Sequence, residues 1–261
     1  MSTALVAPPS HEFVDRRVLG GFRCVDSITG KTVVAPLTVN SSVLTIRPNR
    51  SGTWVVFNGA GLAALTNDFQ PPSVWPNPTA FEIAIQDHSG TYLPRRATLQ
   101  IPAKLAPASD PASVFNPQII TLCVTPSAQA GANWAVIRAS VVRAGTTPMR
   151  GLADTLLRVT RTSDNAVLAT GMTDARGEAL LAVPGLGVRA SSSGSGAVLE
   201  ATTAVSVTAY FDAAALTQPA GWLPDPDEML VNLGGASVKS ATQTAQLGSG
   251  LSINLNFSIS V

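Results

Sequence analysis

The sequence of 261 residues is poor in charged side chains, and those present are balanced in sign. Asp, Glu, Lys and Arg make up 13% of the residues, about half the share of an average soluble domain. There are 17 basic and 16 acidic residues, which leaves a formal net charge of +1. This balance argues against a nucleic-acid-binding protein, which normally carries a basic domain or patch. Hydrophobic residues reach 45%, so disorder of the whole chain is excluded.

Long apolar runs and targeting signals are also missing. No stretch approaches the roughly 18 consecutive apolar residues of a membrane helix, so we expect no membrane insertion. The N-terminal stretch MSTALVAPPSHEFVDRR has neither a basic start nor an apolar run of about 7–15 residues. We therefore expect synthesis in the cytoplasm without a signal peptide.

Cysteine and histidine are scarce. The two cysteines, Cys24 and Cys123, belong to no C-x-x-C pair, and His11 and His88 lie far from both in sequence. This spacing excludes a zinc finger and predicts no metal site. The sequence alone does not exclude a disulfide between the two cysteines, but the missing export signal favours free, buried thiols.

Helical periodicity is weak and confined to 60–67 and 210–216, whereas strand signals are frequent. The final segment, LSINLNFSISV over 251–261, alternates apolar and polar residues without error. Because side chains at every second position of a strand share a face, this segment predicts a half-buried strand of an antiparallel sheet.

The strand signals fall into two groups separated by a segment rich in Pro, Ala and Ser. The first group is bounded by turn clusters at the spacing of a β-sandwich and comprises 21–25, 33–39, 43–46, 53–57, 80–86 and 97–101. The separating segment contains PAKLAPASDPASVFNPQ and is interpreted as a linker with an edge strand at 119–124. The second group comprises 134–142, 155–161, 166–170, 178–183, 198–210 and 251–261.

The sequence therefore predicts an all-β protein with two tandem antiparallel β-sandwich domains. The expected order is an extended N-terminal arm, a first sandwich, a linker and a second sandwich, over 1–18, 19–103, 104–132 and 133–261. Each half opens with a strand, a turn and a proline-bearing segment, which indicates a weak internal repeat. Residues 212–250 give no clear pattern, and LPDPD over 223–227 is expected to be irregular because of its prolines.

A family resemblance is carried by VIRASVVRAGTTP over 136–148, by 156–160 and by TDARGEALLAV over 173–183. These segments resemble the transthyretin-like or carboxypeptidase-regulatory-like β-sandwich, which repeats a strand, a proline turn and a T-D-x-x-G turn before a returning strand. Gly177 suits that tight turn because glycine adopts a positive φ without steric cost. The resemblance implies a transthyretin- or Ig-like sandwich, although Pro148 lies two residues beyond the expected Gly-Pro spacing. The ring-opening hydrolases of that family use a His and Arg constellation that has no counterpart here.

A second resemblance is carried by FEIAIQDHSGTYLPRRATLQIP over 81–102 and by VDSITG over 25–30 followed by PLTV over 36–39. These segments are similar to small accessory proteins of phage-tail-like contractile injection systems. The resemblance implies a structural or adaptor subunit near the cap or baseplate, in contact with other subunits and present in multiple copies in a ring. It also implies assembly into a particle that is released.

Candidate catalytic and metal-binding residues are few. His88 lies in a turn where a polar residue is expected in any case, and His11 lies in the predicted arm. Asp225, Asp227 and Glu228 gather in one loop and offer the oxygen ligands that Ca²⁺ prefers. Without EF-hand spacing, and with two prolines in the run, they favour a solvated loop. We therefore predict no catalytic residue, no cofactor and no metal.

The candidate partner contacts are Trp75, Trp222, Arg95 and Arg96. Each of the two tryptophans lies near a proline in a predicted loop, where an exposed ring contacts protein or glycan. The arginine pair suits an acidic partner, or alternatively it solvates an edge strand and discourages aggregation.

Two hypotheses for function follow. The leading one is a non-enzymatic structural or adaptor subunit of a phage-tail-like contractile particle. Its alternative is a stand-alone β-sandwich module that binds glycan or peptide, which predicts a monomer with Trp75 or Trp222 exposed.

Overall fold

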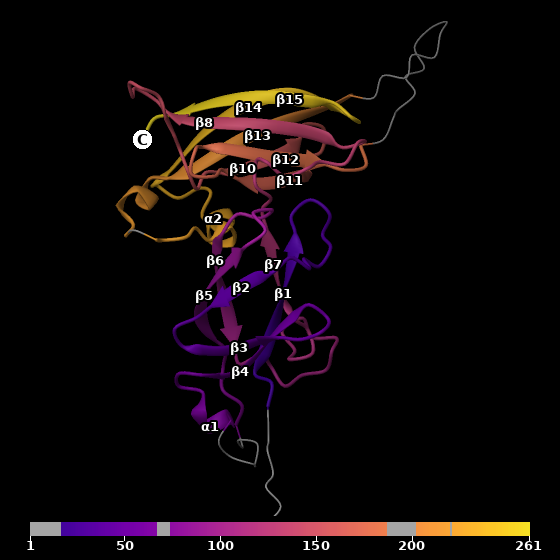
Figure 1. Cartoon of the computed structure of the whole chain (residues 1–261), viewed down its shortest axis with the longest axis vertical. Coiled ribbons are helices and arrows are strands. Elements are labelled where there is room, and N and C mark those ends of the chain that lie inside the picture. The colour runs from indigo at the N-terminus through magenta and orange to yellow at the C-terminus, as the bar shows by residue number, and fades with distance from the viewer. Residues whose placement is uncertain (1–16, 67–73, 187–201, 220) are drawn as a thin grey trace, which may run out of the picture.

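A computed structural model describes residues 17–66, 74–186, 202–219 and 221–261 (Figure 1). Most of the predicted arm, including His11, and the start of the predicted strand 198–210 lie outside these residues. The regular structure is almost entirely β, so the all-β prediction is confirmed. Helical elements are short: α1 (Ala63–Thr66), the 3-10 turn η1 (Ala213–Thr217) and α2 (Pro226–Val231). Within the described ranges, no helix is both long and apolar enough to span a membrane.

The first part of the chain forms two facing sheets, here called the N-terminal sandwich. Its strands are β1 (Gly20–Asp26), β2 (Leu37–Asn40), β3 (Leu44–Pro48), β4 (Thr53–Gly59), β5 (Thr79–Asp87), β6 (Arg95–Ile101) and β7 (Gln118–Leu122). One sheet has the order β3-β4-β1-β7 and the other β2-β5-β6. The predicted strand 33–39 begins only at Leu37, because Pro36 has no amide hydrogen to donate and restrains the residue before it.

Alternating residues of the two sheets fill the core of the N-terminal sandwich. Phe22 of β1 is fully buried and stacks on Trp54 of β4, with ring centroids 6.2 Å apart. On the opposite sheet, Ile83 of β5 and Leu99 of β6 belong to the same buried cluster. This face-to-face packing is the expected consequence of period-2 alternation on both sheets.

The segment predicted as a linker is not a single connecting piece. It contains β7, which pairs in parallel with β1 so that Ile120 lies opposite Cys24. β7 is the outer strand of its sheet, which confirms the edge strand expected at 119–124. Through β7, part of 104–132 therefore belongs to the N-terminal sandwich.

The rest of the chain forms a second pair of facing sheets, here called the C-terminal sandwich. Its strands are β8 (Ala135–Arg143), β9 (Arg150–Gly151), β10 (Leu156–Arg161), β11 (Val167–Met172), β12 (Glu178–Val183), β13 (Thr202–Asp212), β14 (Val238–Gly248) and β15 (Ser252–Ile259). One sheet has the order β12-β8-β15, with β9 beside β8, and the other has the order β11-β10-β13-β14. The strands of this sandwich run crosswise to those of the N-terminal sandwich in Figure 1.

The last strand corrects one expectation. β15 pairs in parallel with β8, with Phe257 opposite Val141, and not with an antiparallel neighbour as predicted for 251–261. The prediction was wrong because alternation reports which face of a strand is buried and carries no information on the direction of the neighbouring strand.

The two sandwiches share a topology. In each, the first strand lies between an antiparallel strand and the parallel last strand, as β4-β1-β7 and as β12-β8-β15. They differ in two respects. β3 pairs with β4 whereas β11 pairs with β10 in the opposite sheet, and β9 beside β8 has no counterpart strand beside β1 within the described residues. The internal repeat of two related domains expected from the sequence stays a prediction.

The T-D-x-x-G turn is tightly integrated into the C-terminal sandwich. The buried Thr173 hydroxyl donates to the Leu152 carbonyl at 2.7 Å and accepts the Thr155 amide at 2.9 Å. Gly177 has φ +79°, and a Cβ atom there would overlap the Val141 carbonyl oxygen. The glycine is therefore required both by its backbone conformation and by close approach of another strand.

We predict that Gly177→Ala lowers the free energy of unfolding by more than about 3 kcal/mol, because it adds a backbone clash to the cost of a positive φ. Gly145→Ala is the matched control, since Gly145 has φ +73° but no atom within 4 Å of an added Cβ. The control is expected to cost about 1 kcal/mol. Urea denaturation followed by circular dichroism measures both, and equal losses would contradict the role of close packing.

Candidate functional site

The connection between β13 and β14 reaches from the C-terminal sandwich to the N-terminal sandwich (Figure 1). Its α2 begins directly after Asp225, whose carboxylate accepts the Asp227 amide at 3.1 Å as an N-cap. Pro226 occupies the first turn, where its missing amide hydrogen costs nothing. Asp227 and Glu228 also lie in this turn, where their negative charges interact favourably with the positive end of the helix dipole. The expectation of irregular structure over 223–227 is therefore wrong at its C-terminal end.

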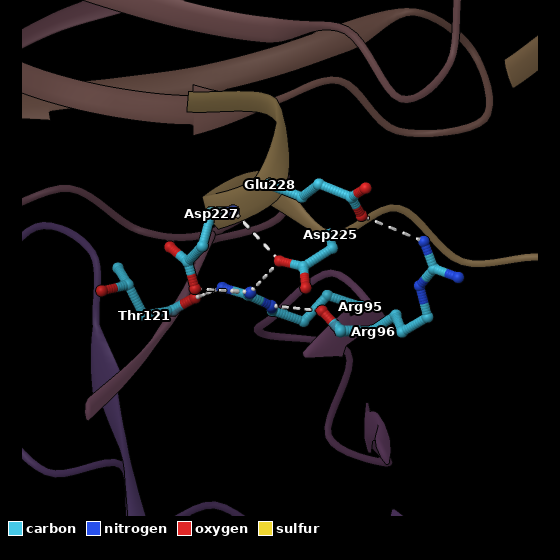
Figure 2. A network of polar contacts seen from close by, with 6 residues as sticks. All are labelled: Arg95, Arg96, Thr121, Asp225, Asp227 and Glu228. Atoms are coloured by element: carbon cyan, nitrogen blue, oxygen red, sulfur yellow. Dashed lines mark hydrogen bonds and ion pairs between the residues drawn. The ribbon is translucent and has the colours of Figure 1, made fainter. Parts of the chain in front are cut away.

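Arg95, the first residue of β6, is the centre of the contact between the two sandwiches (Figure 2). Its Nη2 donates to Asp225 Oδ1 and to Asp227 Oδ2, both at 2.8 Å. Its Nη1 donates to the Thr121 carbonyl at 2.7 Å and its Nε to the Arg96 carbonyl at 2.9 Å. One guanidinium thus joins β6, β7 and the start of α2.

Burial makes this network sensitive to the loss of Arg95 or Asp225, whereas Asp227 is 57% exposed. Arg95 is 2% exposed and Asp225 is 4% exposed, so both charges are removed from water. A buried ion pair adds little net stability, because desolvation offsets the attraction between its charges. Removing either member of the buried Arg95–Asp225 pair leaves an uncompensated buried charge, which costs about 3–5 kcal/mol. The network therefore mainly fixes where the β13–β14 connection docks.

Arg96 leaves β6 in the opposite direction and makes weaker contacts (Figure 2). Its guanidinium bonds Glu82 at 3.1 Å and Glu228 at 3.4 Å, and it lies 5.5 Å from the centre of the Trp222 ring. Because its side chain is 25% exposed, these ion pairs contribute little to stability. Its backbone amide donates to the Pro224 carbonyl at 2.8 Å, which covers an open edge of β6.

Two small apolar clusters complete the junction. In the first, Cys123 packs with Leu156 and Met172 of the C-terminal sandwich. In the second, Val124 packs with Val136 and Leu180. These clusters bury apolar area between the sandwiches, whereas the arginine network supplies the directional contacts.

The structure brings three of the four candidate contact residues together. Arg95, Arg96 and Trp222 meet at the junction, and the acidic partner of the arginine pair is the 225–228 segment of the same chain. The solvated loop expected there is wrong for Asp225, which is buried, and edge solvation is wrong for Arg95. Trp75 lies elsewhere, where it packs against the N-terminal core and donates from Nε1 to the Ala103 carbonyl at 2.9 Å.

Two cavities adjoin the network. One of about 180 Å³ is lined by Cys123, Met172 and Pro226, among other mostly apolar residues. The other, of about 240 Å³, is lined by Trp222 and by several polar side chains. Asp154 lines both, and burial raises the pKa of its carboxyl group.

The described residues hold no group of three or more His, Cys, Asp or Glu side chains arranged for a metal ion. His88 lies in an exposed turn of the N-terminal sandwich, with its Nε2 2.6 Å from Thr38 Oγ1. Both cysteines are free and buried, as expected. Burial raises the pKa of Cys123 to about 11 and that of Cys24 to about 12, and the charge of Arg95 partly opposes both shifts.

Comparison with known proteins gives little further information. No protein-family model matches the sequence, and no curated protein matches it. Among solved structures, the chain is similar to "The Bacillus anthracis TIE protein", with a TM-score of 0.27 and 6% sequence identity. The match covers 94% of this chain and 34% of that chain, so this chain spans about a third of its length. A likeness with so low a TM-score carries no argument about function.

We predict that Arg95→Met lowers the free energy of unfolding by about 3–5 kcal/mol, because Asp225 then stays buried without its cation. Arg96→Met, which removes only partly exposed pairs, is the control and is expected to cost at most about 1 kcal/mol. Adding Asp225→Asn to Arg95→Met removes the stranded charge and keeps the helix cap, so it is expected to restore part of the loss. Urea denaturation of the four proteins checks this order, and equal costs for Arg95→Met and Arg96→Met would contradict it.

The two thiols are predicted to report on different parts of the structure. At pH 8 both react slowly with a disulfide reagent such as DTNB, because burial raises the pKa of each thiol. Arg95→Met is expected to accelerate labelling of Cys123, which lies in the junction, more than labelling of Cys24 in the N-terminal core. The rates are measured in Cys24→Ala and Cys123→Ala backgrounds, and equal acceleration would indicate general unfolding instead.

Proposed function

We propose that the protein is a non-enzymatic structural or adaptor subunit of a larger protein assembly. The observation that carries this proposal is the junction, where buried groups join the two sandwiches in one arrangement. A subunit that connects neighbours across a particle needs such a fixed arrangement, because mobile parts lose entropy on assembly. We further infer that the two sandwiches are tandem domains, since their main buried clusters share no residue.

Exposed apolar side chains support contacts with other subunits. Large apolar residues with more than two thirds of their surface exposed occur on both sandwiches and on the β13–β14 connection: Val34, Val74, Phe115, Met149 and Val231. Permanent protein–protein interfaces are more apolar than transient ones. The low charge of the chain agrees with a surface of which part is covered in an assembly.

The kind of assembly is proposed from the sequence resemblance. The segment 81–102 that is similar to accessory proteins of phage-tail-like contractile injection systems forms β5, the turn after it and β6. We propose a place near the cap or baseplate of such a particle, in multiple copies in a ring, since such particles have cyclic symmetry. Release of the particle after assembly is part of the same proposal.

A second candidate function is a stand-alone binding module for glycan or peptide. The observation that favours it is Trp222, a partly buried aromatic residue that lines two cavities, of about 240 and 500 Å³. Aromatic rings beside a few well-placed polar groups are typical of ligand sites.

Sedimentation of an affinity-tagged chain from the lysate of its native cells tests the leading proposal. Co-sedimentation with tube-and-sheath particles in negative-stain images is the expected result. The double variant Phe115→Ser and Met149→Ser is expected to move the protein toward the slow fraction, because it removes two exposed apolar contacts. Lys31→Ser, which changes an exposed charged residue, is the control. A wild-type monomer that stays in the slow fraction while such particles pellet without it would overturn the proposal.

A further inference from the structure

We propose that the protein binds a neutral carbohydrate in a cleft beside Trp222. The Trp222 cleft is defined here as the inner cavity of about 240 Å³ together with the outer groove of about 500 Å³. Both are lined by Arg96 and Trp222. This inference rests on the second candidate function, the binding module, and specifies its ligand class.

The cleft lies between structural parts that come from both sandwiches. The inner cavity is bounded by β13, η1 and α2, with Tyr210, Gln218 and Asn232 among its lining residues. The outer groove is bounded by β5 and the turn after β2, with Ser42 and Glu82 among its lining residues. Because the Arg95 network fixes α2 against β6, the walls of the cleft are held in place without a ligand.

Several polar groups in the cleft have unused hydrogen-bonding capacity. Among the described residues, the side chains of Tyr210, Gln218, Asn232 and Asp154 make no hydrogen bond, although all four line the inner cavity. Arg96 Nε is buried without an acceptor. Gln218 and Asn232 are exposed, whereas Tyr210 and Asp154 are partly buried. Because partly buried polar groups normally find partners, Tyr210, Asp154 and Arg96 Nε point to a ligand that supplies both donors and acceptors.

The balance of charge selects a neutral ligand. Asp154 and Asp212 line the inner cavity, have no cationic partner in the part of the chain that the structure describes, and would repel an anion. Arg96 stands at the boundary with the outer groove, and its buried Nε needs an acceptor that a simple cation does not offer. A polyhydroxylated ligand donates to carboxylates and accepts from the guanidinium through the same hydroxyl groups.

The two aromatic residues of the inner cavity agree with this ligand class. Trp222 and Tyr210 each combine an apolar ring with a polar group that makes no hydrogen bond among the described residues. Sugar rings have apolar faces of C–H groups and hydroxyl rims, and the same combination of aromatic surface and hydrogen-bonding groups complements them. An open groove continuous with the Trp222 ring suits an oligosaccharide better than a single sugar.

The test follows the indole N–H signals of ¹⁵N-labelled full-length protein by NMR. The protein has four tryptophans, and Trp222→Phe assigns the signal of the cleft. The probes are neutral hexasaccharides of glucose, mannose and N-acetylglucosamine, with the cationic glucosamine hexamer and an anionic hyaluronan hexamer as charge controls. We expect one neutral hexasaccharide to shift the Trp222 signal and to leave the other three tryptophan signals unchanged.

Matched variants place the ligand in the cleft. Gln218→Ala and Gln246→Ala each remove an exposed side-chain amide that makes no hydrogen bond with the described residues, but only Gln218 lines the cleft. Gln218→Ala is expected to weaken binding about 3–10-fold, the effect of one lost hydrogen bond, and Gln246→Ala to leave it unchanged. Asp154→Asn is expected to weaken binding by a similar factor. The backbone of residue 154 has a positive φ, which Asn adopts as readily as Asp.

Other results would overturn the inference in separate ways. Preferential binding of the cationic or anionic hexamer would exclude a neutral ligand, and equal affinity of all variants would exclude this cleft. A set of uncharged hexapeptides is titrated in parallel. Peptide binding without saccharide binding would overturn the proposal of a carbohydrate ligand but would agree with the proposed binding module. If neither class of ligand shifts the Trp222 signal, both proposals are overturned. Co-sedimentation with particles tests the assembly proposal independently of all these results.

Discussion

The position of the two sandwiches relative to each other depends on one buried guanidinium group, that of Arg95. Arg95 donates four hydrogen bonds to groups on β6, β7 and the α2 connection, which are three segments far apart in the sequence. The cost of removing the charge from water is offset mainly by the buried carboxylate of Asp225. Other arrangements of the β13–β14 connection would leave a buried cation without its anions. The apolar clusters around Cys123 and Val124 tolerate some sliding, whereas the four directional hydrogen bonds of the arginine do not.

Much of the fold can be predicted from the sequence because alternation is strong where one face of a strand is buried. The bounds of β12 agree with the segment predicted from alternation, and those of β5 and β8 differ by a residue. β14 was not predicted, because VKSATQTAQLG is rich in small and polar residues and only its last two residues are buried. Its strand conformation comes from pairing with β13 over the full length of both, which is a tertiary effect.

The candidate site could be predicted only in part from the sequence. In β6, Arg95 occupies the same face as Ala97, Leu99 and Ile101, all of which are buried. This alternation predicts that the Arg95 side chain points into the protein. A buried arginine needs an anion within the protein. The D-P-D-E run at 225–228 was likewise readable as a capped helix start. Their pairing was not predictable, because 130 residues separate Arg95 from Asp225 and no local pattern links them.

The parallel pairing of first and last strands has a mechanical consequence. In the N-terminal sandwich the chain enters at the start of β1 and leaves at the end of β7, at opposite ends of the same ladder. β8 and β15 repeat this arrangement in the C-terminal sandwich. A pulling force applied through the chain therefore loads each ladder in shear, so that its hydrogen bonds bear the load together and do not open one after another. Resistance to such a force is governed by the rate of unfolding. Because the hydrogen bonds must break together, this strand order slows unfolding under force in both sandwiches.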